Sequence, residues 1–195
     1  ILLGLVGSEM CIRDRLWLAQ DDPKKNTAVL SAKRGDIILH KKISSLPKRG
    51  IILEPLCGKI FGPEDHNLLI KKGGALVGLD CSWNQIESSV DRVMRQTRLQ
   101  PRMLPLLLAA NPVNWGKPGK LTTIEALATA VYLTGNKSQA SNLLGGFRWG
   151  QRFIELNYEP LEEYSAAKSS SELVNLQFEF FDIEPVSYTH LRAHE

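Results

Sequence analysis

The segment ALVGLDCSWNQ, residues 75–85, decides the fold class of this chain. Residues 75–80 form a largely apolar run without the apolar–polar alternation of a half-exposed strand, which is typical of a strand buried on both faces of a parallel sheet. Ser82 and Gln85 then have the spacing of a capping box, which predicts that a helix begins directly after the strand. The segment therefore predicts a strand–helix unit of an open α/β sheet.

Similar apolar runs on either side of this unit predict further strands. They are LWLA at 16–19, IIL at 37–39, IIL at 51–53 and LPLLLAA at 104–110. After Leu121 the apolar residues change to helical spacing, which predicts an all-α region. They are Ile124, Leu127, Ala128 and Val131, then Leu143, Leu144 and Phe147, and later Leu173, Leu176 and Phe180.

These patterns predict an α/β domain over residues 16–111 and an all-α domain over residues 121–185. The connector between them, residues 112–120, contains Pro112, Pro118, Gly116 and Gly119, which favour a rigid loop. The terminal strings SEMCIRDR and VSYTHLRAHE resemble translated sequencing-adapter read-through. We therefore exclude residues 1–15 and 186–195 from the fold and expect the natural protein to run from about Leu16 to Pro185.

The composition is that of a soluble globular protein. Of 195 residues, 43% are hydrophobic and 23% are charged, and the net charge of +3 is too small to establish a polyanionic partner. Three cysteines without close pairing favour a reducing compartment, and no Cys or His spacing suits zinc or another metal. The longest uncharged apolar run, Met103–Ala110, is far shorter than the roughly 20 residues that cross a bilayer.

Charge is distributed unevenly along the chain. Residues 16–60 contain nine lysines and arginines against four acids, whereas residues 151–182 contain two against seven. A second basic set recurs at helical spacing, which is expected to put at least three of its guanidinium groups on one helix face: Arg92, Arg95, Arg98 and Arg102. Two basic clusters in one half of the chain are consistent with either a phosphate-binding surface or an ordinary solvated surface.

Three predicted helix beginnings carry candidate chemistry. Trp83 follows the carboxyl end of a strand, where ligands bind in open α/β sheets, although a core aromatic there is equally consistent. The second capping box, Thr122 to Glu125, opens a helix whose first N–H groups could hold a carboxylate. An ordinary capped helix without a ligand explains the same pattern. Thr27 is a candidate N-cap that could bind an anion or sit in a solvated basic turn.

The sequence lacks the common catalytic signatures. His40, His66, Cys57 and Cys81 have no partner at ligand or triad spacing, so we assign them structural roles. Neither a Gly-x-Gly-x-x-Gly nor a Gly-Lys-Ser/Thr phosphate loop occurs, which excludes the commonest dinucleotide-binding and nucleotide-hydrolysing folds.

Five segments in order carry a family resemblance: DPKKNT at 22–27, ILEP at 52–55, LDCSW at 79–83, RMLPLLLAANPVNWGKPGKLTTIEALA at 102–128 and FRWGQRFIELN at 147–157. Together they resemble the ribosomal-RNA aminocarboxypropyltransferases of ribosome biogenesis. The resemblance implies a SPOUT-like, knotted domain with a mostly parallel sheet, followed by an all-α domain. It also implies S-adenosylmethionine as cofactor and transfer of its 3-amino-3-carboxypropyl group to a modified pseudouridine of small-subunit rRNA.

The resemblance assigns residues to the methionine and ribose parts of the cofactor. Thr27 and the backbone N–H of Thr123 would hold the methionine carboxylate, and the carbonyl of Leu79 would bind the ribose hydroxyls. Trp83 would cover the cofactor methyl group and leave the aminocarboxypropyl carbon exposed to the base. Orientation would then select the transferred group.

The resemblance also assigns the adenine pocket. The backbones of Leu104 and Gly119 would contact the adenine edge, and Leu53, Pro55 and Leu121 would line the pocket. Family members usually carry a bulky aromatic residue at the position of Gly119, so side-chain packing there would be lost in this chain.

The nucleophile would be the imide nitrogen of the base, so no covalent enzyme intermediate is needed. Asp80 is a candidate for balancing the sulfonium charge or accepting the imide proton, although helix capping explains it equally well. Seven residues are predicted to contact RNA phosphates: Lys24, Lys25, Lys48, Arg49, Arg92, Arg95 and Arg98.

We expect small-subunit rRNA or a pre-ribosomal particle as partner, no membrane, and a cytoplasmic monomer. Two other functions remain open. A SPOUT methyltransferase would use the same cofactor and release S-adenosylhomocysteine rather than methylthioadenosine. A non-catalytic ribosome-assembly factor would keep the basic face and bind no cofactor.

Overall fold

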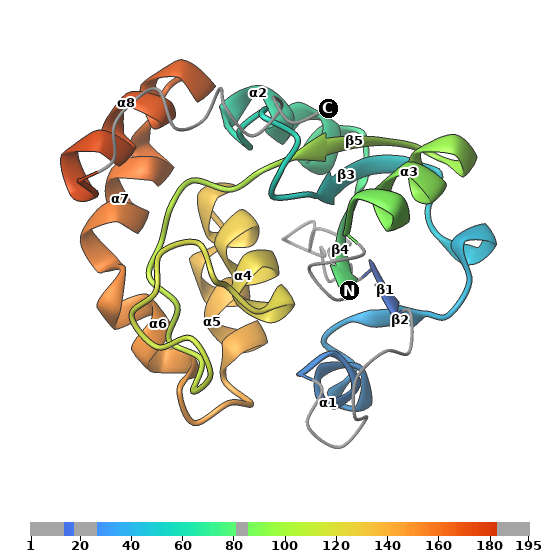
Figure 1. The fold of residues 1–195 in the computed structure, drawn as a ribbon, viewed down its shortest axis with the longest axis horizontal. Coiled ribbons are helices and arrows are strands. Elements are labelled where there is room, and N and C mark those ends of the chain that lie inside the picture. Colours follow the sequence, from blue (N-terminus) through green and yellow to red (C-terminus); the bar gives the residue numbers. More distant parts are fainter. Residues whose placement is uncertain (1–13, 18–26, 81–85, 183–195) are drawn as a thin grey trace, which may run out of the picture.

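The computed structural model describes residues 14–17, 27–80 and 86–182 (Figure 1). All described strand pairs are parallel, and the strand order in the sheet is β2–β1–β4–β3–β5. The strands are β1 (Asp14–Trp17), β2 (Ile38–His40), β3 (Arg49–Leu53), β4 (Ala75–Asp80) and β5 (Arg98–Arg102). The predicted α/β class with a parallel sheet is confirmed, while the knotted path of the chain stays a prediction.

Short helices connect the strands, and longer helices follow the sheet. The connecting elements are α1 (Thr27–Arg34), the 3-10 turn η1 (Ile43–Ser45), α2 (Pro63–His66), the π-helical turn η2 (Asn67–Lys71) and α3 (Ile86–Gln96). The C-terminal helices are α4 (Thr123–Leu133), α5 (Lys137–Leu144), α6 (Gly150–Leu156), α7 (Tyr158–Ala166) and α8 (Ser170–Phe180). Figure 1 shows these last helices, coloured yellow to red, gathered on one side of the sheet.

The central strands are buried on both faces, as their unalternated apolar runs predict. On β3, Ile51 and Leu53 face the larger core cluster, and Ile52 faces a smaller cluster beneath α3 and η1. The larger cluster also contains buried residues of the C-terminal helices, among them Ile124 and Leu127. The sheet and the C-terminal helices therefore share one continuous core across the predicted connector.

Strand β1 begins at Asp14, before the predicted start of the α/β domain. Asp14 pairs with Val77 of β4, and Arg15 pairs with Gly78. Residues 14 and 15 thus belong to the sheet, although we assigned them to a terminal segment outside the fold. The adapter origin of residues 1–15 and 186–195 stays a prediction, because the other terminal residues lie outside the described ranges.

The prediction of a strand at 104–110 is wrong. The fifth strand of the sheet is β5, which ends at Arg102, before this segment. Strand β5 lies at the edge of the sheet, where only one face is covered, and Pro101 is tolerated at such an edge. Accordingly Leu99 is buried, whereas its neighbours Arg98 and Gln100 are exposed. A half-exposed edge strand carries too few apolar residues to be recognised by an apolar run.

The prediction of at least three arginines on one helix face is also wrong. Helix α3 ends at Gln96, so Arg92 and Arg95 lie on the helix and Arg98 and Arg102 lie on β5. The hydroxyl of Thr97 donates to the carbonyl of Val93 at 2.9 Å, which helps to end the helix. Helical spacing across residues 92–102 therefore did not reflect one continuous helix.

Buried side chains replace a strand partner along the extended segment 104–110. The N–H groups of Leu106, Leu108 and Ala110 each donate to a side-chain oxygen of a C-terminal helix or helix junction. The acceptors are Gln177 at 2.9 Å, Asn157 at 2.7 Å and Glu125 at 2.8 Å, all of them buried. An apolar segment can thus be buried without a sheet ladder because its alternate backbone donors are satisfied.

No helix in the described ranges combines the length and the apolar character needed to cross a membrane.

Candidate functional site

The carboxyl ends of β3 and β4 meet the beginning of α4. Leu53, the last residue of β3, pairs with Gly78 of β4. The hydroxyl of Thr123, the first residue of α4, donates to the carbonyl of Leu79 at 3.2 Å. Leu53, Leu79 and Thr123, which we predicted to bind different parts of one cofactor, therefore lie together at one edge of the sheet.

Gly78 allows the close approach of α4 to β4. A Cβ atom at this position would lie 2.5 Å from Cγ2 of Thr123 and 3.5 Å from Cγ of Leu127. Because real Cβ contacts are not this short, any side chain at residue 78 would push the first turn of α4 away from the strand. Gly78 therefore positions the beginning of α4.

Replacing Gly78 by alanine should weaken about tenfold the binding of the cofactor that the family resemblance implies, and should destabilise the fold by about 1–3 kcal/mol, because the first turn of α4 must move. Calorimetric titration and urea unfolding measure the two effects. Gly145→Ala is the matched control, since Gly145 has a helical φ of −59° and the nearest atom to an added Cβ is 3.4 Å away. Equal affinities for the two variants would contradict the role given to Gly78.

The capping box at the beginning of α4 is confirmed. The N–H of Glu125 donates to the hydroxyl of Thr122, and the N–H of Ala126 donates to the carbonyl of Thr122. Of the first-turn donors, the N–H groups of Thr123 and Ile124 have no hydrogen-bond acceptor among the described residues. Two backbone donors at the positive end of the helix dipole suit a carboxylate.

Glu125 holds the loop that leads into α4. Its carboxylate is fully buried and accepts hydrogen bonds from the N–H of Ala110 and from the N–H and side-chain amide of Asn111, at 2.8–3.0 Å. It also accepts from the N–H and hydroxyl of Thr122, at 2.6 and 2.8 Å. Five donors compensate the buried charge without a basic partner. Sequence analysis identified Glu125 only as a helix cap, because these donors come from a loop that is brought back by the fold.

The predicted adenine-pocket residues lie in segments held side by side. Leu104 and Leu121 are half-buried and pack against the larger core cluster, and Pro55 is half-buried after β3. The N–H of Gly119 donates to the carbonyl of Leu107 at 2.9 Å, which joins the segments before and after the connector. Gly119 has a φ of +69°, a conformation that suits glycine. Because its N–H is occupied by Leu107, its carbonyl is the backbone group left to contact the adenine edge.

Three predicted residues are described in part or not at all. Thr27 is the first residue of α1, and Asp80 is the last residue of β4, paired with Trp17; for both, the description is confined to the backbone. Trp83 lies outside the described residues, as does the first capping box. Their predicted roles stay predictions.

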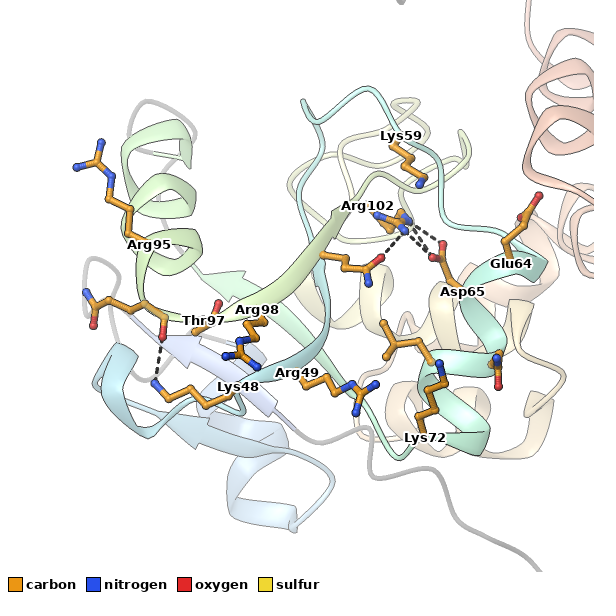
Figure 2. Close-up of a pocket in the computed structure, with 14 residues that line it drawn as sticks. Lys48, Arg49, Lys59, Glu64, Asp65, Lys72, Arg95, Thr97, Arg98 and Arg102 are labelled. Atoms are coloured by element: carbon orange, nitrogen blue, oxygen red, sulfur yellow. Dashed lines mark hydrogen bonds and ion pairs between the residues drawn. The ribbon is translucent and has the colours of Figure 1, made fainter.

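A basic groove runs along the exposed edge of β5 (Figure 2). Its volume is about 1070 Å³, and its walls come from the amino end of β3, alternate residues along β5, the end of α3, and α2 with η2. Figure 2 shows Lys48 and Arg98 near one end, Lys72 on the opposite wall and Lys59 near the other end. Six exposed cations line the groove: Lys48, Arg49, Lys59, Lys72, Arg95 and Arg98.

The acidic residues of the groove are engaged by other groups. Asp65 pairs with Arg102, and both side chains are 6% exposed; Nε of Arg102 lies 2.8–2.9 Å from the two carboxylate oxygens. Glu64 accepts hydrogen bonds from the hydroxyl and N–H of Ser170 at the beginning of α8, and these bonds lower the pKa of Glu64. Glu64 stays ionised, but the lysines and arginines of the lining outnumber its two carboxylates, so the net charge of the groove is positive.

The groove gathers four of the seven residues predicted to contact RNA: Lys48, Arg49, Arg95 and Arg98. Arg92 is exposed on α3 but does not line the groove, and Lys24 and Lys25 lie outside the described residues. Sequence analysis missed Lys59 and Lys72, since only the packing of α2 and η2 beside β5 brings them to the groove. Among the residues that the structure describes, none of the predicted cofactor-binding residues lines it.

Comparisons with known proteins match most of the chain. A family model described as ribosome biogenesis protein, C-terminal, matches residues 51–181. The 16S rRNA aminocarboxypropyltransferase of Methanosarcina mazei is 45% identical over 158 residues, covering 81% of this chain and 88% of that protein. The enzyme of the same name from Methanocaldococcus jannaschii is 41% identical over 161 residues, covering 83% and 91%.

A solved structure has the same fold. The SAM-dependent rRNA:acp-transferase of Vulcanisaeta distributa is 37% identical, with a TM-score of 0.72. The match covers 88% of this chain and 96% of that chain. The similarity thus extends over both the sheet and the C-terminal helices.

Proposed function

The chain belongs to the family of 16S rRNA aminocarboxypropyltransferases, and on this premise we propose that it transfers the 3-amino-3-carboxypropyl group of S-adenosylmethionine to 16S rRNA. The acceptor is a pseudouridine of the small-subunit rRNA, methylated or not, within the mature subunit or its precursor. The transfer is a step of ribosome maturation.

When bound, S-adenosylmethionine supplies an electrophilic carbon: the imide nitrogen attacks it, an N–C bond forms, and the C–S bond breaks with its electron pair going to methylthioadenosine. The imide proton must pass to a base. Asp80, at the carboxyl end of β4, is the candidate acceptor for that proton. No covalent intermediate with the protein is required.

The beginning of α4 carries the proposal, because its two available N–H groups fit a carboxylate. The N–H groups of Thr123 and Ile124 are available among the described contacts, next to the carbonyl of Leu79. Thr27 begins α1, and α1 contacts α4. The neighbouring helix α1 therefore offers a second helix N-terminus. A carboxylate fixed by these donors would fix the chain that carries the reacting carbon.

The remaining residues would orient the other parts of the cofactor. Leu53, Pro55 and Leu121 offer apolar surface to the adenine, and the backbones of Leu104 and Gly119 offer hydrogen-bonding groups to its edge. Trp83 would cover the methyl group. With the methyl group covered and the amino-acid arm directed to the acceptor, the chain would favour transfer of the arm.

Two labelled forms of the cofactor test the proposal. Incubation of the protein with 16S rRNA and carboxyl-labelled S-adenosylmethionine should label the RNA, whereas methyl-labelled S-adenosylmethionine should not. Methylthioadenosine should accumulate in equal amount with the modified nucleoside, measured by mass spectrometry. Transfer of the methyl label with release of S-adenosylhomocysteine would instead identify a methyltransferase. Absence of cofactor binding in calorimetry would identify a non-catalytic assembly factor.

A further inference from the structure

We propose that the basic groove along β5 binds a stretch of RNA sugar–phosphate backbone, as an anchor distinct from the cofactor-binding edge. This inference rests on the proposed function, which supplies the RNA. It begins with the six exposed cations that line the groove: Lys48, Arg49, Lys59, Lys72, Arg95 and Arg98. The groove is about 1070 Å³ in volume and open to solvent, so it can admit a polymer that enters and leaves.

The charge of the groove is available to a ligand. Among the described residues, Arg49, Lys59, Lys72, Arg95 and Arg98 form no ion pair. Lys48 donates to the carbonyl of Gln96 at 3.2 Å, which holds the amine near the end of α3 and leaves its charge without an anion. Unpaired cations gathered in one hollow raise the local potential and attract a polyanion.

The geometry favours a polymer over a single small anion. Arg98, Gln100 and Arg102 recur on one face of β5, at about 6.6 Å from one to the next. The lining therefore extends about 13 Å along the strand, from its amino end to its carboxyl end. Arg102, at the carboxyl end, lies two residues before Leu104, so the groove leads towards the cofactor-binding edge.

The lining favours contact with phosphates rather than with bases. Within the described parts of the chain, no lining residue is aromatic, so these walls offer no surface on which an unpaired base would stack. Cations that contact the backbone position the RNA without selecting its sequence. Selection of the acceptor would then fall to the carboxyl edge of the sheet, where the reaction occurs.

Neutralising two cations on opposite walls tests the anchor. In Lys72→Gln/Arg98→Gln, the slope of log affinity against log salt should become shallower by about 1.4, because two phosphate contacts are lost. Affinity at 0.1 M KCl should fall about 20-fold, measured by fluorescence anisotropy with a labelled 16S rRNA transcript. An unrelated RNA of the same length should lose affinity by the same factor, since backbone contacts are independent of sequence.

Arg152→Gln/Lys168→Gln is the matched control, because it removes the same charge from exposed residues outside the groove. Circular dichroism checks that each variant is folded, and Arg49→Gln/Lys59→Gln replaces the first pair if that pair fails to fold. Equal affinity and equal salt slope for the groove and control variants would overturn the inference. A loss confined to the 16S rRNA probe would also overturn it.

The same experiment separates the anchor from the catalytic proposal. Calorimetry with S-adenosylmethionine should give the same affinity for the groove variant and the wild-type protein, because neither Lys72 nor Arg98 is a predicted cofactor-binding residue and none of the described ones lines the groove. If the wild-type protein binds RNA through the groove but transfers no label, the proposed function fails and the anchor stands.

Discussion

Replacing Glu125 by glutamine should destabilise the protein by about 3–5 kcal/mol and weaken cofactor binding by more than tenfold. The carboxylate accepts five hydrogen bonds in a fully buried position. An amide can accept at its oxygen only, so donors around Oε2 would face an N–H₂ group and lose their acceptor. Each buried donor left unpaired costs about 1–3 kcal/mol.

The loss of cofactor affinity is expected because Glu125 holds the loop that leads into α4. Glu125 joins Ala110, Asn111 and Thr122, and thereby sets the path between Leu104 and Thr123. Urea unfolding measures the stability, and calorimetry with S-adenosylmethionine, at a temperature where the variant is folded, measures the affinity.

Glu172→Gln is the matched control for Glu125→Gln. Glu172 occupies the same position after the N-cap of α8, and its N–H also donates to the N-cap hydroxyl, that of Ser169. Its carboxylate is exposed and accepts from the N–H of Lys168 alone among the described contacts, so the substitution should cost less than about 1 kcal/mol. If the two variants lose similar stability, the hydrogen-bond network around Glu125 does not contribute as we infer.

Replacing Asp65 by alanine should destabilise the protein by about 3–5 kcal/mol. The guanidinium of Arg102 would then be buried without its counter-charge, since both side chains are 6% exposed. Gln100 and the carbonyl of Pro101 would keep their hydrogen bonds to Arg102, but neither carries a charge. Urea unfolding measures the loss.

A double variant separates the ion pair from the space that it fills. Asp65→Leu/Arg102→Met should recover most of the lost stability, because apolar side chains of similar size avoid the buried charge. The exposed pair Arg152–Glu155 is the control, and Arg152→Ala should cost less than about 1 kcal/mol. Both variants also lose the hydrogen bond from the N–H of Gly62 to Asp65, so a double variant as unstable as Asp65→Ala would show that the unpaired charge does not cause the loss.

The apolar runs at 51–53 and 75–80 were sufficient to predict β3 and β4, because central parallel strands are apolar on both faces. The run at 37–39 also predicted β2, although β2 lies at the edge of the sheet and Ile38 is 51% exposed. The capping box at Thr122 predicted the beginning of α4 for a similar reason, since it depends on neighbours within one turn. Edge strand β5 was missed because only one of its faces is buried. The apolar segment 104–110 was mistaken for a strand because burial alone does not specify a sheet partner.

The sequence by itself determined the parallel sheet, the helical C-terminal half and the family, because local patterns and unusual motifs need no distant contact to be recognised. Tertiary structure alone decided that Gln177, Asn157 and Glu125 satisfy the backbone of 104–110, and that Lys59 and Lys72 join Arg98 in one groove. Hydrogen bonds and electrostatic potential depend on distance in space, and residues far apart in the chain come within that distance only when the chain is folded.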